Sequence, residues 1–88
     1  MIDAREAVRR VSEYFRDLQV GKEDLEVELE EIEMTEDQKF WLITLSYRRA
    51  FLIGPPAREK HYKVFKVDAN TGDVMWMRIW RADAPART

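Results

Sequence analysis

The side chains that could perform acid–base or nucleophilic chemistry are few in this 88-residue chain. Cysteine is absent, which excludes disulfides, thiolate metal sites and cysteine nucleophiles. The only histidine, His61, has no second histidine with which to build a zinc site, and only Glu59 lies near enough in sequence to orient it as a base. Ser12 and Ser46 are the only serines, and neither lies in a Gly-x-Ser-x-Gly turn. We therefore expect no enzymatic activity and no bound metal or cofactor.

The acidic residues offer no better candidate for a site. Carboxylates are plentiful between Glu23 and Asp37, but they lie along a predicted strand and its turns. Asp68-x-Asn70-x-Gly72 resembles the start of a calcium loop, yet the position that needs a bidentate glutamate is occupied by Ile79. The three glycines are scattered, so there is no phosphate-binding loop. A tight hairpin explains the residues around Gly72 fully.

The first element to position these residues is an amphipathic helix, predicted over residues 3–19. Apolar residues recur at three- and four-residue steps from Ala4 to Leu18. Asp3 and Glu6 fit a capping box at the helix N-terminus, and Gly21 can end the helix.

Four strand-like stretches follow, at about residues 25–34, 39–53, 60–67 and 74–81. The consecutive Glu30 and Glu31 interrupt the alternation of the first stretch and predict a bulge. Asp68 and Gly72 predict a hairpin turn between the third and fourth strands. The predicted fold is one α+β domain over residues 1–88, with an N-terminal helix packed on a four-stranded antiparallel meander sheet.

Charge is distributed unevenly along the chain. Residues 1–21 are neutral, residues 22–37 carry a net charge of −8 and residues 38–88 carry +6, giving −2 for the whole chain. An acidic first strand at the sheet edge would repel a second copy of itself and pair with basic neighbours. The alternative is that this strand docks a basic partner.

One helix can cover only one face of a four-stranded sheet, so the other face needs a separate explanation. In the second strand, we expect four side chains to share the face that the helix covers: Trp41, Ile43, Leu45 and Tyr47. In the fourth strand, strict alternation places Val74, Trp76 and Trp80 on one face. Met75, Met77 and Ile79 then lie on the opposite face.

Large apolar side chains on the uncovered face favour a partner that buries them. The predicted interface residues are Phe40, Leu42, Phe51, Leu52, Ile53, Trp76 and Trp80. A different register would expose Met75, Met77 and Ile79 instead. The competing explanation is that the connection over residues 50–59 folds across this face.

Basic residues and aromatics also alternate in the second half of the chain, as they do in some single-strand nucleic-acid binders. Tyr62, Phe65 and Lys66 belong to this pattern. However, the chain as a whole is acidic and lacks the glycine–aromatic motif of the common RNA-binding sheet. Nucleic-acid binding is therefore the weaker alternative.

The segments Ala4–Val8, Phe40–Tyr47 and Tyr62–Val74 together resemble PepSY-like domains of the cystatin-like architecture. The resemblance implies one helix wrapped by an antiparallel meander, and a regulatory or inhibitory binding module of a kind often attached to proteases. A protease inhibitor that uses the loop over residues 51–58 is thus a second possibility. Gln19-Val20-Gly21 follows the helix rather than forming a hairpin tip, so the cystatin inhibitory motif is not carried over.

Taken together, these patterns predict a small non-enzymatic binding or regulatory module. Its expected partner is a second copy, forming a homodimer, or another protein. Neither a signal peptide nor a membrane-spanning stretch is evident, so we expect a cytoplasmic location without membrane contact.

Overall fold

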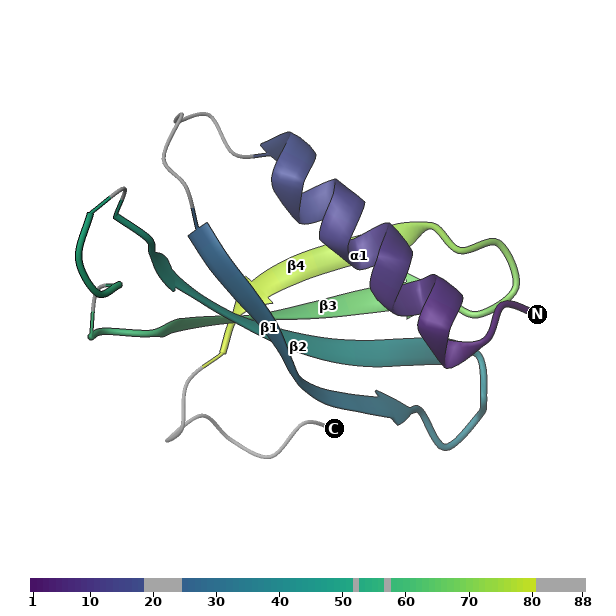
Figure 1. The fold of residues 1–88 in the computed structure, drawn as a ribbon. Coiled ribbons are helices and arrows are strands. Elements are labelled where there is room, and N and C mark those ends of the chain that lie inside the picture. The colour runs from purple at the N-terminus through teal and green to yellow at the C-terminus, as the bar shows by residue number, and fades with distance from the viewer. Residues whose placement is uncertain (19–24, 52, 57, 81–88) are drawn as a thin grey trace.

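The computed structural model (Figure 1) describes residues 1–18, 25–51, 53–56 and 58–80. It contains one helix, α1 (Ala4–Leu18), and four strands: β1 (Leu25–Met34), β2 (Phe40–Arg49), β3 (His61–Asp68) and β4 (Val74–Ile79). The strands pair in the order β1-β2-β3-β4, each antiparallel to the next, and α1 lies across one face of the sheet. The predicted α+β fold, a helix on a meander, is confirmed.

The helix begins where its capping residue predicts. The carboxylate of Asp3 accepts a hydrogen bond from the Glu6 backbone N–H at 2.8 Å, which satisfies one donor without a helical partner. The Glu6 side chain pairs with Arg9 and Arg10 instead of reaching back to residue 3, so only one half of the predicted capping box forms. The predicted end of the helix at residues 19–21 lies outside the described residues.

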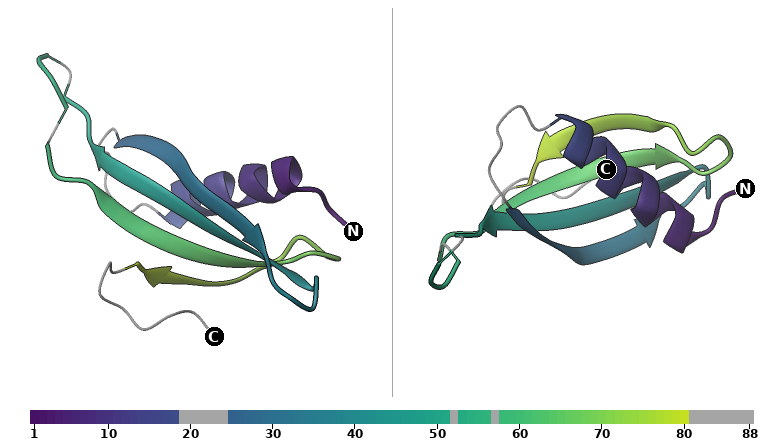
Figure 2. Two further views of the ribbon diagram at one scale, coloured as in Figure 1. Left: turned by 90° about the horizontal axis from the view of Figure 1, so that it is seen from below. Right: turned by 45° about the horizontal axis from the view of Figure 1, so that its top comes forward.

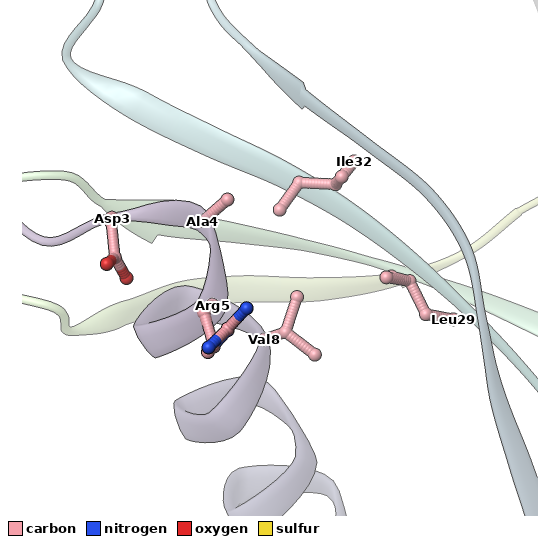
Figure 3. Close-up of a pocket in the computed structure, with 6 residues that line it drawn as sticks. All are labelled: Asp3, Ala4, Arg5, Val8, Leu29 and Ile32. Carbon is pink, nitrogen blue, oxygen red and sulfur yellow. The ribbon is translucent and has the colours of Figure 1, made fainter.

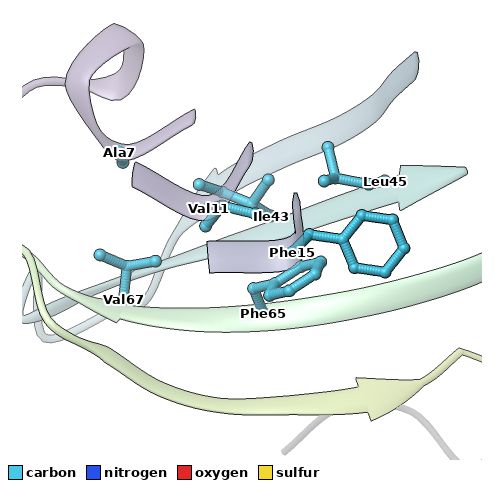
Figure 4. Packing of buried hydrophobic residues seen from close by; sticks show 7 residues of the cluster. All are labelled: Ala7, Val11, Phe15, Ile43, Leu45, Phe65 and Val67. Atoms are coloured by element: carbon cyan, nitrogen blue, oxygen red, sulfur yellow. The ribbon is translucent and has the colours of Figure 1, made fainter. Parts of the chain in front are cut away.

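The core lies between α1 and the two central strands. Ala7, Val11 and Phe15 of α1 are buried against residues of β2 and β3 (Figure 4). The four residues of β2 predicted to face the helix do so: Trp41, Ile43, Leu45 and Tyr47. Phe65 of β3 is fully buried, and its ring centroid lies 6.0 Å from that of Phe15 in an edge-to-face arrangement.

The N-terminus is fixed to one end of the sheet. The Ile2 N–H donates to the carbonyl of Ala69 at 2.7 Å, and the indole Nε1 of Trp41 donates to the carbonyl of Ile2 at 3.2 Å. These bonds fix the start of α1 over the ends of β2 and β3.

Two bulges set which side chains share a face. The predicted bulge in β1 is confirmed, since Leu29 pairs with Leu45 and Glu31 pairs with Thr44. A second bulge at Met75 was not predicted: Val67 pairs with Val74 but Lys66 pairs with Trp76. The prediction that Val74 shares a face with Trp76 and Trp80 is therefore wrong. The bulge reverses the alternation, and Val74 packs against the core beside Met77.

The second strand is shorter than predicted. It ends at Arg49, which is the last residue of β2 to pair with β1, rather than at residue 53. Its pairing with β3 ends earlier still, where Tyr47 lies opposite His61. Within the described residues no strand pairs with the chain beyond Arg49 on either side, so the ladder is not extended there. The fourth strand was predicted to end at residue 81. β4 ends at Ile79, and residue 81 itself lies outside the described residues.

The hairpin between β3 and β4 forms as predicted. The Asp68 carboxylate accepts hydrogen bonds from the backbone N–H groups of Asn70 (2.7 Å) and Thr71 (3.0 Å). Gly72 has a φ of 82°, and a Cβ at this position would lie 2.7 Å from the Arg10 guanidinium. Backbone N–H groups of the turn therefore donate to the Asp68 carboxylate, as a tight hairpin requires.

Candidate protein-interaction surface

The outer face is the side of the sheet turned away from α1. By register, alternation and the bond between Ser46 and Glu30 it carries these side chains: Glu26, Glu28, Glu30, Glu31, Glu33, Phe40, Leu42, Thr44, Ser46, Arg48, Tyr62, Val64, Lys66, Asp68, Trp76, Arg78 and Trp80. No described helix or strand lies on it (Figure 1). Four of the predicted interface residues meet on this face: Phe40, Leu42, Trp76 and Trp80.

The remaining predicted interface residues do not join them. Phe51 and Ile53 lie in the connection after β2, which extends beyond the end of the sheet (Figure 2). Ile53 is 89% exposed and Phe51 is also exposed, so neither packs over the outer face. The competing explanation, that these side chains cover the face, is wrong for both. Leu52 lies outside the described residues.

The aromatic side chains of the outer face are half-buried rather than bare. The Lys66 ammonium lies 4.1 Å from the centre of the Phe40 ring, and the Arg78 guanidinium lies 4.1 Å from the Trp76 ring. The rings of Tyr62 and Trp80 pack with centroids 5.2 Å apart. Basic side chains thus cover part of the apolar surface that the sequence predicted to be open to water.

The centre of the outer face is buried and polar. The Ser46 hydroxyl donates to the Glu30 carboxylate at 2.6 Å. The Thr44 hydroxyl is also buried, in a residue only 5% exposed, and has no hydrogen-bond partner among the described residues. An unmatched buried hydroxyl is costly, so Thr44 is a point at which an additional polar contact would be stabilising.

Charge on the outer face is polarised from one edge to the other. Row by row across the sheet, one set of paired residues is Glu31, Thr44, Val64 and Arg78, and the next is Glu33, Leu42, Lys66 and Trp76. Each row begins with an acid on β1 and has a base on β3 or β4. At the other end of β1, Glu26 pairs with Arg48 at 2.8 Å and Glu28 lies 3.7 Å from the Lys60 ammonium.

Both edge strands also carry exposed apolar side chains: Met75 lies at the bulge of β4 and is 54% exposed, and the others lie on the helix-covered side. The sequence named Met75 and Ile79 only for a different register and did not predict the exposure on β1. Val27 and Leu29 of β1 are 42% and 48% exposed, and Ile79 of β4 is 62% exposed. An α-helix is about 10 Å wide, whereas four strands span about 19 Å. That difference in width was available from the sequence and indicates that edge strands would be incompletely covered.

An open groove of about 580 Å³ follows from this incomplete cover (Figure 3). The groove lies between the first half of α1 and β1, and we call it the edge groove. It is lined by Asp3, Ala4, Arg5, Val8, Leu29 and Ile32. Ala4 and Val8 line it from the helix, and Leu29 and Ile32 line it from the strand.

The residues considered for catalysis are dispersed. His61 is exposed at the start of β3, with its ring 5.4 Å from that of Tyr47. Ser46 bonds to Glu30, and Ser12 lies on α1. Across residues 1–18, 25–51, 53–56 and 58–80, no group of three or more His, Cys, Asp or Glu side chains is placed to hold a metal ion.

Comparison of the chain with known protein families, curated proteins and solved structures finds no match. The structure shows the architecture alone: one N-terminal helix on a four-stranded antiparallel meander. Within the described part of the chain, no helix has the length and apolar character that crossing a bilayer requires.

Proposed function

We propose that this chain is a non-enzymatic, PepSY-like binding or regulatory module that associates with a second copy through the outer face of its sheet. The observation that carries the proposal is the polarised charge of that face. Acidic side chains line the β1 edge, and Lys66 and Arg78 sit among aromatic rings near the β4 edge. Such a face is complementary to itself when one copy is turned over.

The symmetry of the pair follows from the charge. A two-fold axis parallel to the strands lays β1 of one copy over β4 of the other, which brings Glu31 opposite Arg78 in the same cross-strand row. An axis perpendicular to the strands would lay β1 over β1 and oppose like charges. The first arrangement is therefore the one proposed.

The size of the face favours a weak dimer. A four-stranded sheet of this length presents roughly 500 Å² of flat area. Standard protein interfaces bury about 800 Å² on each partner, and smaller ones are mostly transient. Half-buried Phe40, Leu42, Trp76 and Trp80 would supply the apolar contacts, and the charged rows would set the orientation.

Charge reversal tests the proposal directly. We expect Arg78→Glu and Glu31→Arg each to weaken self-association about tenfold or more, because each opposes like charges across the interface. Mixing the two variants should restore association, because one interfacial pair of the mixed dimer is then the original Glu31–Arg78 pair and the other is attractive with its charges exchanged. Sedimentation velocity or light scattering over a concentration series, at low and high salt, measures the change.

Arg16→Glu is the matched control, because Arg16 is exposed on α1, away from the outer face. It should leave association unchanged. A wild-type chain that stays monomeric to millimolar concentration would overturn the proposal, as would an equal loss of association in all three variants.

A protease inhibitor acting through residues 51–58 is the second candidate. It is favoured by the exposure of Ile53 at 89% beside Gly54, whose φ is 96°, in a connection that projects from the sheet. Replacing residues 51–58 with a glycine–serine linker should abolish inhibition of a protease while leaving self-association intact. Single-stranded nucleic acid is disfavoured, because the face that carries Tyr62 and Lys66 also carries the glutamates of β1.

A further inference from the structure

β1 is a ten-residue strand at one edge of the described sheet. β1 pairs only with β2, and no other strand within the described residues lies along its second side. An edge strand presents unpaired backbone N–H and C=O groups, which can pair with an added strand. β4 is also an edge, but it is six residues long and interrupted by the bulge at Met75.

Next to this open edge, the helix-facing side of β1 is apolar. α1 packs mainly on β2, β3 and β4, which leaves the edge groove between α1 and β1 (Figure 3). Val27 and Leu29 point to this side and are the exposed apolar residues of the strand. An apolar side chain entering from beyond the edge would contact Leu29 and Val8.

The opposite side of the same strand is acidic. β1 contains five glutamates and no base, and Glu26 and Glu28 are exposed although they contact Arg48 and Lys60. Solvent-exposed ion pairs of this kind contribute little, so they can be exchanged for others. A second β1 strand would be repelled here, whereas a strand with basic residues in alternate positions would be attracted.

We infer that the β1 edge binds an extended segment of a partner protein in which apolar residues alternate with lysine or arginine. The segment adds a fifth strand to the sheet. One of its apolar side chains enters the edge groove beside Leu29 and another lies beside Val27, and its basic side chains lie beside Glu26 and Glu28. Backbone pairing supplies affinity, and the alternation supplies specificity, as in other cases of strand addition.

The bulge after Leu29 limits the length of the pairing. Residues 25–29 form one regular arm of β1, and the register changes between Leu29 and Glu31. A bulge twists the strand and disturbs its edge pattern. Regular pairing is therefore expected along residues 25–29, which corresponds to a core motif of about five residues in the partner.

Three synthetic peptides of ten residues test this inference on the full chain. The first alternates lysine and valine, the second has the same composition with all lysines in one block, and the third has glutamate in place of lysine. The alternating basic peptide should shift the backbone amide NMR signals of residues 25–29 and bind at least tenfold more tightly than either control. Equal binding of the block peptide would show charge attraction without strand addition and would overturn the inference.

Matched variants locate the site. Leu29→Lys should weaken binding of the alternating peptide about tenfold, because it places a charge in the edge groove. Ile79→Lys is the control, since Ile79 is similarly exposed on the same side of the sheet but on the other edge strand. Equal losses in the two variants, or amide shifts confined to β4, would contradict the inference.

The inference does not depend on self-association through the outer face. Arg78→Glu, which should disrupt the proposed dimer, leaves the edge groove and residues 25–29 unchanged. It should therefore keep its affinity for the peptide. Failure of one proposal is thus distinguishable from failure of the other.

Discussion

At the scale of single residues, Asp68 shows how one side chain organises a turn. The backbone N–H groups of Thr71 and Asn70 donate to its carboxylate and hold the pKa of Asp68 below its ordinary value of 3.8. Gly72 completes the turn with a positive φ that an L side chain rarely adopts. The hairpin between β3 and β4 therefore depends on the charged form of one carboxylate and on one glycine.

The lowered pKa of Asp68 predicts how stability changes with pH. The unfolded chain binds this proton more readily than the folded one, so the stabilisation is fully present above the ordinary pKa of 3.8 and is lost as pH falls through the folded pKa. An amide oxygen accepts hydrogen bonds at any pH. As the pH is lowered from 5 through the folded pKa of Asp68, the Asp68→Asn variant should therefore lose less stability than the wild type. Thermal unfolding midpoints of the two proteins over this range measure the difference. Parallel curves would contradict the prediction.

At the scale of elements, α1 is stabilised at its N-terminus by Asp3 and along its exposed side by ion pairs. Hydrogen bonds from Arg9 and then Arg10 hold the pKa of Glu6 at about 2. These pairs are exposed to solvent, and exposed ion pairs add little to stability. The cap should therefore matter more than the pairs, because it satisfies a backbone donor that has no helical partner.

Removing the cap tests this comparison. Asp3→Ala should lower the free energy of unfolding by about 1 kcal/mol, whereas Asp3→Asn should change it little because asparagine caps equally well. Asp17→Ala is the matched control in the last turn of the same helix, where a negative charge opposes the helix dipole. It should be neutral or slightly stabilising. Urea unfolding followed by circular dichroism gives all three values, and a loss at residue 17 equal to that at residue 3 would be inconsistent with capping.

At the scale of the whole molecule, one small core carries the fold. Phe65 is fully buried beside Phe15 (Figure 4), and its ring also packs edge-to-face with that of Tyr14. Domains of this size bury a modest share of their surface and have little stability to spare. The core between α1 and the central strands is thus the point at which a single change would unfold the chain.

Truncating the core and outer-face phenylalanines should have unequal effects. Phe65→Ala should cost about 3–5 kcal/mol, because it removes a ring from a fully buried site. Phe40→Ala should cost less, since Phe40 is half-buried on the outer face and is covered by Lys66. Equilibrium urea unfolding at one protein concentration measures both. Similar costs would mean that the outer face carries as much of the fold as the core.

Much of the fold was predictable because the relevant signals are local. The helix cap at Asp3, the bulge after Leu29 and the hairpin at Gly72 all follow from the types and spacing of neighbouring residues. The bulge at Met75 was not predictable in this way. The segment Val74–Ile79 is apolar at every position except Arg78, so no change of residue type marks the bulge. Only pairing with β3 reveals that Val74 faces the core.

The candidate surfaces divide in the same manner. The sequence by itself indicated that Phe40 and Leu42 share one face of their strand and that Trp76 and Trp80 share one face of theirs, since side chains alternate with a fixed period in a strand. Pairing through β3 brought these two sets together on the face away from the helix. Only the tertiary structure decided how exposed those side chains are and that Val27 and Leu29 border an open groove. Exposure depends on contacts between residues far apart in sequence, such as Lys66 over Phe40 or α1 beside β1. A pattern of neighbouring residues in the sequence does not reveal such long-range contacts.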